Sequence, residues 1–437
     1  MEVVLPTPPP PADDAKSPRR RHRRKKASQE QQAEEEGVIR PPPERSSEAE
    51  SQASSVTRSV SADRSDASCV SFFRTQAEST DLEFFVHEFV RGKPVIVMKW
   101  DGTDPQLPAV MLNSHMDVVP ASKDDWTHDP FGADMDEEGR IFARGAQDTK
   151  QLAIMAVEAV RRLKMRGVKL RRNVLITVMP DEEIGGADGM EKFVQSEDFH
   201  KLNVGFELDE GPVSPEEEYA VTNGERSSWK VKVRCRGFTG HGSIPVPGTP
   251  GEKLRVVLDR FMDFRQEELD KLQQDPNLWM ADVTSTNLTI VEGGSALNVI
   301  PPEMSAVFDL RINPLMDFDK LEEKIWQWCS DAGEGVELEF LAKQDKVPTT
   351  LIGADNKWWT AFQKATEKLE MKIKPLILPA TSDARFIRRA GIPALGFMPI
   401  NNTPLLPHGI DEYITAASLL RGIDIFQGVL QEVANVL

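Results

Sequence analysis

Cysteine is scarce in this chain. Its 437 residues include three cysteines, Cys69, Cys235 and Cys329, which is an odd number at wide spacings. That arrangement provides neither a disulfide framework nor a cysteine-based zinc pattern, so it excludes a disulfide-stapled secreted domain and favours a reducing compartment. The cytoplasm is therefore the expected location.

Long apolar runs and an excess of positive charge are also missing. No stretch approaches the roughly 20 consecutive apolar residues of a membrane helix, and the opening MEVVLPTPPPP lacks the basic and apolar regions of a secretory signal. With 53 Lys and Arg against 70 Asp and Glu, the formal net charge is −17. Broad binding to nucleic acid or to an anionic membrane is not expected, because both require a basic surface.

Aromatic residues are absent from the first 66 residues, which are rich in Pro, Ser, Glu, Gln and Arg. Such a segment cannot bury enough apolar surface to offset its ordering entropy. We therefore predict a disordered tail over residues 1–67. The basic run Lys16–Lys26 within it is either a nuclear-localisation or RNA-contacting patch or, as is more common, a solvated run of charge.

The remainder has the composition of a globular enzyme and is too long for one compact core. From about Ser71, apolar β-rich runs alternate with amphipathic helical runs, which predicts an α/β fold with a mixed, mostly parallel sheet. A helix is expected in DTKQLAIMAVEAVRRLKMRG, because Leu152, Met155, Ala156 and Val160 recur at helical spacing. The buried strands are expected in AVMLNSH, NVLITVMP, VGFELDE and PALGFMPI.

The middle of the chain follows a different pattern. Between Tyr219 and Glu337, the strand-like runs WKVKVRCRG, TSTNLTIVEGG and MSAVFDLRI are interleaved with two long helical runs. This order predicts an antiparallel α+β module inserted into the first domain. We therefore expect a first domain of residues 68–218 and 338–437 and an inserted domain of residues 219–337.

Carboxylate and imidazole groups recur where the predicted strands end, which is where sites gather in α/β sheets. His115 and Asp117 follow the first strand; residues two apart share a face in extended chain, so Asp117 can orient His115 as a ligand. Asp148 lies in a Gly-rich turn before the predicted helix. Taken alone, Asp148 is better explained as a helix N-cap.

The next two strands end in adjacent acids. Asp181, Glu182 and Glu183 follow NVLITVMP, and Asp209 and Glu210 end VGFELDE. Adjacent carboxylates at the end of a buried strand repel one another and lose solvation, so a cation is indicated.

His408 lies in a polar loop after the last predicted strand. Oxygen and imidazole ligands without thiolates suit a hydrolytic pair of zinc ions. Such a pair activates water, while one carboxylate of an adjacent pair is free to act as the general base.

With these residues in place, the chain resembles the M20 metallopeptidase family, and within it the enzymes that hydrolyse N-acyl-L-amino acids. The resemblance runs from about Ser71 to the C-terminus. It rests on ordered motifs that include NSHMDVVP, WTHDPF, ARGAQDTK, PDEEIGG, LDEGP, GHGS, EGGSALNVIPPEMSA, FDLR, DARFIR and IPALGF.

The resemblance implies two Zn²⁺ ions per subunit and assigns the ligands. By position within the motifs, His115 and Asp209 would bind one zinc, Glu183 and His408 the other, and Asp148 would bridge both. Glu182 would be the general base, and Asp117 would orient His115.

The resemblance also implies a homodimer that takes up a small N-acyl amino acid. His241 of the inserted domain would reach a neighbouring subunit's active site and stabilise the oxyanion. Asn298 and Arg311 would contact substrate, and Arg385 would hold the substrate carboxylate.

Two alternatives remain open from the sequence. An M20-type dipeptidase or carboxypeptidase would share the metal centre and differ in its acyl pocket. In addition, the family has an opening helix before the segment that aligns with SFFRTQAESTDLEF, where this chain has the predicted tail. A core left uncovered by that helix would make the chain a catalytically impaired binding protein.

Overall fold

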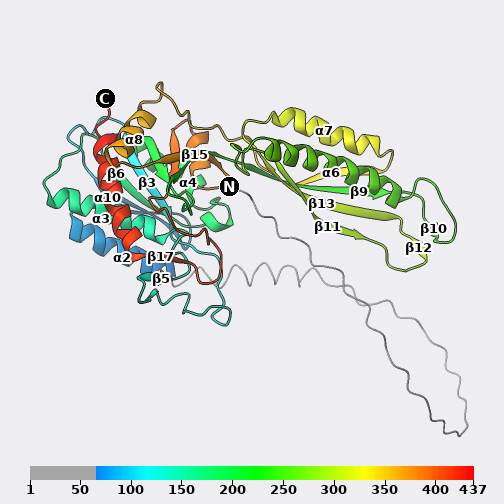
Figure 1. Cartoon of the computed structure of the whole chain (residues 1–437), viewed down its shortest axis with the longest axis horizontal. Helices are drawn as coiled ribbons and strands as arrows, with labels where there is room; N and C mark the ends of the chain where they lie inside the picture. Colours follow the sequence, from blue (N-terminus) through cyan, green and yellow to red (C-terminus); the bar gives the residue numbers. More distant parts are fainter. Residues whose placement is uncertain (1–64) are drawn as a thin grey trace, which may run out of the picture. The chain divides into compact units, whose positions relative to one another are not determined.

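The computed structural model describes residues 65–437, and side chains from residue 68 (Figure 1). The predictions for residues 1–64, including the tail and its basic run Lys16–Lys26, lie outside the described residues. Residues 65–67, the end of the predicted tail, belong to the first described helix, α2 (Ser65–Thr80).

One large sheet organises the first part of the fold. Its strands lie in the order β1-β2-β6-β3-β7-β16-β8-β15. The pairs β6/β3, β3/β7 and β7/β16 in its middle are parallel, as is β8/β15, whereas β1/β2, β2/β6 and β16/β8 are antiparallel. The strands are β1 (Glu83–Val90), β2 (Lys93–Trp100), β3 (Ala109–His115), β6 (Val174–Met179), β7 (Val204–Asp209), β8 (Tyr219–Glu225), β15 (Ile373–Leu378) and β16 (Ala394–Phe397).

The sheet confirms the predicted mixed α/β class with its largely parallel centre. Strands β3 and β6 are buried along their whole length, because helices cover both faces of the sheet. On β2, alternate side chains divide between two cores: Ile96 and Met98 belong to one, and Val95 and Val97 to the other. The four apolar runs expected as strands are those of β3, β6, β7 and β16.

Helices of different size cover the two faces. The larger core includes side chains from α2, α3 (Lys150–Met165), α8 (Lys357–Lys368) and α10 (Ala416–Val433), and α10 packs against both α3 and α8 (Figure 1). The opposite core is smaller. It is closed by the short helices α4 (Met190–Val194), α5 (Glu197–Leu202) and α9 (Ala384–Arg389).

Helix α3 forms where the apolar spacing predicts it. Its buried side chains include Leu152, Met155, Ala156 and Val160, and basic residues occupy its last turn. Cations there interact favourably with the negative end of the helix dipole. The helix begins at Lys150, with Thr149 as its N-cap, so Asp148 lies just before its first turn.

Helix α2 contains the segment SFFRTQAEST, which the resemblance aligns after the family's opening helix. It packs against β1, β2 and α3 and buries Phe73 and Ala77. Burying a Phe side chain contributes about 1.5–3 kcal/mol. The segment before α2 lies outside the described residues, so the expectation that the family's opening helix is missing stays a prediction.

A second sheet forms the core of the inserted module. It is antiparallel, with the strand order β11-β13-β9-β14. Two long helices pack their apolar sides against it around Trp229, Phe261 and Phe308 (Figure 1). The elements are β9 (Ser227–Arg236), α6 (Pro250–Gln274), β11 (Ser285–Gly293), β13 (Glu303–Ile312), α7 (Phe318–Asp331) and β14 (Val336–Lys343).

The ends of this module differ from the predicted range of 219–337. Strand β8 pairs with β15 and β16 of the large sheet, so residues 219–225 do not belong to the insert. Strand β14 pairs with β9 and extends the insert to Lys343. Pairing partners rather than local pattern set these boundaries; that the module is a separate domain stays a prediction.

Smaller elements complete the fold. Strands β4 (Asp134–Met135), β5 (Arg140–Phe142) and β17 (Tyr413–Thr415) form one short sheet, and β10 (Gly240–His241) pairs with β12 (Val299–Ile300). The 3₁₀ turn η1 covers Glu182–Ile184. Within residues 65–437, none of the helices combines the length and apolar character needed to cross a membrane.

Candidate metal centre

Three neighbouring parallel strands bring their acidic and imidazole side chains to one edge of the large sheet. Strand β3 ends at His115, β6 leads into Glu182 and Glu183, and β7 leads into Glu210. Because β6, β3 and β7 are adjacent and parallel, their carboxyl ends meet. The predicted gathering of charged side chains at strand ends is therefore present.

The first cluster consists of His115, Asp148 and Glu210, whose donor atoms lie within 4.8 Å of one another. His115 Nε2 is 3.0 Å from Asp148 Oδ1 and 3.4 Å from Glu210 Oε2. Only 1% of the His115 side chain is exposed. Burial lowers the pKa of His115. The charge of Glu210 and hydrogen bonds to neighbouring carboxylates outweigh this effect, so the pKa of His115 lies well above its ordinary value.

The second cluster consists of Asp148, Glu183 and His408. His408 Nε2 is 3.2 Å from Asp148 Oδ2 and 3.0 Å from Glu183 Oε2. Asp148 thus directs one oxygen into each cluster. It is not the N-cap of α3, since Thr149 holds that position without a side-chain capping bond.

The strand-end acid that lies in the first cluster is Glu210. The resemblance implies Asp209 at this position instead. Asp209 is the last residue of β7 and is 1% exposed. Its Oδ1 accepts a hydrogen bond from Asn113 Nδ2 at 2.9 Å and its Oδ2 one from the Ala384 amide at 2.6 Å. Asp209 therefore supports the sheet edge, and the next residue supplies the carboxylate that faces His115.

Asp117 contributes differently from the expected orientation of His115. Its carboxylate is 3.6 Å from His115 Nδ1, which is too long for a good hydrogen bond, whereas its backbone oxygen is 2.9 Å away. The carboxylate instead accepts the amides of Glu182 at 3.2 Å and Glu183 at 3.0 Å. Asp117 thereby fixes both His115 and the adjacent acid pair.

The three consecutive acids after β6 do not all face the clusters. Lys93 forms ion pairs with Asp181 and with Asp188, and Asp181 adopts a left-handed φ of 73°. Asp181 is therefore neutralised at the side of the site, which leaves Glu182 and Glu183. The Lys93 partner was not foreseen, because nothing local to the acid triplet indicates it.

Glu182 belongs to neither cluster. One of its oxygens is 4.0 Å from Arg385 Nη1, and its side chain is 10% exposed. Burial, and next the charge of Glu210, raise the pKa of Glu182 well above its ordinary value. A buried carboxyl beside the clusters that ligates nothing has the properties of a proton carrier.

The donor set fits a pair of cations. Burial and the charge of Asp148 raise the pKa of Glu183 to about 7, and burial raises that of Glu210 to about 8. Glu183 Oε1 is buried without a hydrogen-bond partner among the described residues. Four carboxylate or imidazole groups around a shared Asp148, with no thiolate, match the oxygen and nitrogen chemistry of hydrolytic zinc sites.

Arg385 is close to the clusters but engaged with the backbone. Its Nη1 donates to Ser382 O at 2.6 Å and its Nη2 to Gly185 O at 2.7 Å. It is 3% exposed. Binding a substrate carboxylate requires that this guanidinium exchange or share those carbonyl partners.

The remaining predicted residues lie in the inserted module. The pairing of β10 with β12 and a hydrogen bond from Gly242 N to Asn298 O (2.7 Å) bring His241 and Asn298 close together. His241 is exposed and shares its Nδ1 with Ser243. Arg311 pairs with Asp309 on β13. Within the described residues, the hydrogen bonds and ion pair of the His241 and Arg311 side chains are to residues of the insert.

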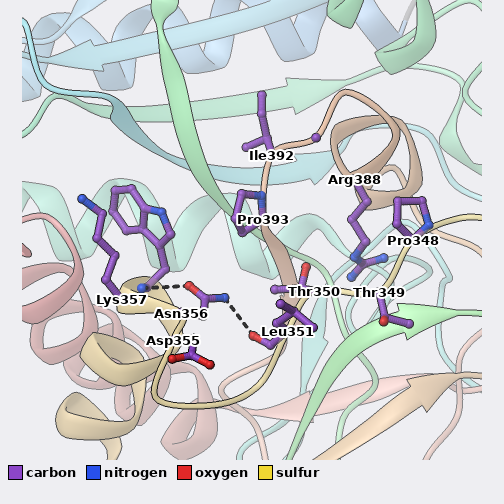
Figure 2. A pocket seen from close by; sticks show the side chains of 12 residues that line it. Pro348, Thr349, Thr350, Leu351, Asp355, Asn356, Lys357, Arg388, Ile392 and Pro393 are labelled. Atoms are coloured by element: carbon purple, nitrogen blue, oxygen red, sulfur yellow. Dashed lines mark hydrogen bonds between the residues drawn. The ribbon is translucent and has the colours of Figure 1, made fainter.

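A separate cavity of about 410 Å³ contains none of the predicted site residues (Figure 2). Several of its polar side chains bond within the chain: Asn356 to Leu351 O and Trp358 N, Thr350 to Ala394 O, and Arg388 to Glu225. The clusters at the sheet edge remain the candidate site.

Comparisons with known proteins identify the family of this chain. Residues 111–432 match Peptidase family M20/M25/M40. The chain is 46% identical to aminoacylase-1 of Homo sapiens over 84% of this chain and 90% of that protein.

Solved structures show the same fold at low sequence identity. An M20 family metallo-carboxypeptidase from Sulfolobus solfataricus superposes with a TM-score of 0.63 at 18% identity, covering 84% of this chain and 93% of that one. A di-peptidase from Saccharomyces cerevisiae gives a TM-score of 0.59 at 19% identity, over 86% and 93% of the two chains.

Proposed function

Because this chain belongs to peptidase family M20/M25/M40 and is an amidohydrolase, we propose that it hydrolyses N-acyl-L-amino acids to a carboxylate and a free L-amino acid. The observation that carries the proposal is the shared Asp148 between two clusters with a free acid, Glu182, beside them. The 46% identity to human aminoacylase-1 supports the substrate class.

We propose that two Zn²⁺ ions occupy the clusters. His115, Glu210 and Asp148 would hold one, and Glu183, His408 and Asp148 the other. Bound zinc lowers the pKa of the attacking water and polarises the amide carbonyl.

Glu182 moves the proton in this proposal. It takes a proton from the attacking water as the carbon–oxygen bond forms, and it delivers that proton to the amide nitrogen as the carbon–nitrogen bond breaks. Its raised pKa suits both steps, because a carboxyl that titrates closer to neutral pH accepts a proton more readily.

Recognition of the substrate falls to arginine and to the insert. Arg385, next to Glu182, would bind the substrate carboxylate, which pairs well with a guanidinium. Asn298 and Arg311 would contact the substrate from the insert. His241 would stabilise the oxyanion of a partner subunit's substrate.

We propose a homodimer formed through the insert. Its edge strand β11 exposes Leu288, Ile290 and Val291, and an edge strand with apolar side chains is a natural pairing surface. Cys235 and Cys329 are buried free thiols, which supports the cytoplasm as the location.

The test uses N-acetyl-L-methionine, its D-enantiomer and the Glu182→Gln variant. The full chain should hydrolyse the L-compound only. The variant should lose roughly 10²–10⁴-fold in kcat while its metal content, measured by mass spectrometry, stays unchanged. A metal-loaded, folded chain that leaves N-acetyl-L-methionine intact would refute the substrate assignment.

A second candidate function is dipeptide or C-terminal peptide hydrolysis. It is favoured by the shared fold with the Sulfolobus carboxypeptidase and the yeast di-peptidase. A panel of dipeptides assayed beside N-acetyl amino acids separates the two, since the preferred class should show the higher kcat/KM.

A further inference from the structure

One buried carboxylate outside the two clusters links the chain segments that carry Asp148 and His408. Glu412 is 0% exposed and lies four residues after His408. Its Oε1 accepts the amides of Gln147 at 2.6 Å and Asp148 at 3.1 Å. Its Oε2 accepts the Gly145 amide at 3.3 Å.

Arg144 completes the link. Its Nη1 donates to Glu412 Oε2 at 2.7 Å and its Nη2 to the backbone oxygen of His408 at 3.1 Å. The Arg144 side chain is 4% exposed and its guanidinium lies 5.1 Å from the Trp126 ring centroid. The planar guanidinium of Arg144 thus binds both the Glu412 carboxylate and the backbone of His408.

Gln147 joins the same two segments in parallel. Its Nε2 donates to Pro404 O at 2.9 Å and to Tyr413 O at 2.8 Å, while its Oε1 accepts the Leu406 amide at 2.9 Å. The turn before Asp148 and the His408 loop are therefore joined by hydrogen bonds on both sides of His408.

These bonds replace missing strand pairing. The turn at residues 145–148 is buried between strand β5 and helix α3, where its amides have no ladder to join. A buried amide without a partner is costly, so the Glu412 carboxylate determines where this turn can lie.

From this network we propose that Glu412, acting through the Asp148 amide and through Arg144, is a positioning residue that sets the separation of Asp148 and His408. The proposal rests on the proposed metal function. It predicts that Glu412 governs metal affinity at the Asp148–Glu183–His408 cluster more than at the cluster of His115, because the two unshared residues of that cluster, His115 and Glu210, lie at strand ends.

The test measures zinc affinity on Glu412→Gln, with Glu268→Gln as the matched control. Glu268 is also a buried acid, and it accepts a hydrogen bond from the Thr284 amide at 2.7 Å and forms an ion pair with Lys271. Unlike Glu412, it lies in the insert. In Glu412→Gln, an amide NH₂ group faces donors that require an acceptor. We expect one of two zinc equivalents to weaken by about 10–100-fold, as supporting residues of metal sites typically do.

Metal rescue separates positioning from simple destabilisation. At saturating zinc, Glu412→Gln should regain most of its kcat with an unchanged KM, whereas Glu268→Gln should show wild-type zinc affinity throughout. Glu412→Asp retains the charge, so its zinc affinity should lie between that of Glu412→Gln and that of the unmutated chain. Unchanged affinity for both zinc equivalents in a folded Glu412→Gln would overturn the proposal.

Arg144→Lys covers the case in which Glu412→Gln does not fold. Lysine keeps the positive charge but cannot donate to Glu412 and His408 in one fork, so the same equivalent should weaken. If neither variant folds while Glu268→Gln does, the network is purely structural and the proposal fails. Zinc titration of the unmutated chain keeps the two proposals distinguishable: two zinc equivalents without turnover would refute the substrate assignment and leave the positioning role intact.

Discussion

The two clusters share Asp148 but are built from different kinds of structure. His115 ends a buried strand and is 1% exposed, whereas His408 lies in a loop with 52% of its side chain exposed. The first cluster is fixed by the sheet itself. The second depends on hydrogen bonds among turns. We therefore expect it to bind metal less tightly and to lose less stability when its histidine is replaced.

Replacing Asp148 removes what the clusters have in common and should have the largest effect. In Asp148→Asn, a neutral amide offers one oxygen where the carboxylate offered one to each cluster. We expect loss of both metal equivalents and activity at background. Metal analysis after gel filtration checks this, with the exposed helix-capping residue changed in Asp275→Asn as the control.

Full occupancy of both sites in Asp148→Asn would show that the clusters do not share a ligand. Each cluster would then have to hold its metal with its own set of ligands.

Changing each histidine in turn should separate the two halves by stability. In metal-free protein, His115→Ala leaves Glu210 without its histidine partner and removes one of the two histidine partners of Asp148, a loss that costs about 3–5 kcal/mol. His408→Ala removes a half-exposed pair and should cost about 1 kcal/mol or less. Urea unfolding in a chelator measures both.

Equal losses from the two histidine variants would contradict the contrast between the clusters. Each variant should also lose one metal equivalent when zinc is supplied, which provides a check that both histidines are ligands.

The adjacent pair Asp209 and Glu210 offers a finer test within the strand-built half. Glu210→Gln should weaken the metal site of His115 without unfolding the chain. Asp209→Asn should retain both metals but lose about 1–3 kcal/mol, because an amide NH₂ replaces an acceptor of the buried Asn113 and Ala384 donors. Zinc titration and unfolding curves on both variants distinguish a ligand from a support.

This pair also shows where sequence reasoning ended. Apolar runs predicted β3, β6, β7 and β16, and periodicity predicted α3, because both signals are local. Which of two adjacent acids faces His115 depends on where β7 ends relative to β3 and on the α9 amide that Asp209 accepts. Neither is encoded within the motif LDEGP.

Long-range partners account for the other differences. Asp117 was assigned to His115 on strand spacing, but β3 ends at His115 and the following chain carries the Asp117 carboxylate to the amides after β6. Glu412 and Lys93 lie far along the chain from the segments they hold. The limits of the insert likewise follow from the pairing of β8 and β14.

Replacing Ile410, in the loop that carries His408, should have the smallest effect on stability and zinc affinity. It lies two residues from His408 and is 58% exposed, so its side chain contributes little burial. Ile410→Ala should change the free energy of unfolding by no more than about 0.5 kcal/mol and leave both zinc affinities unchanged. Since Arg144 and Gln147 hold this loop by its backbone, a loss of zinc affinity in Ile410→Ala would mean that side-chain packing, rather than those hydrogen bonds, positions His408.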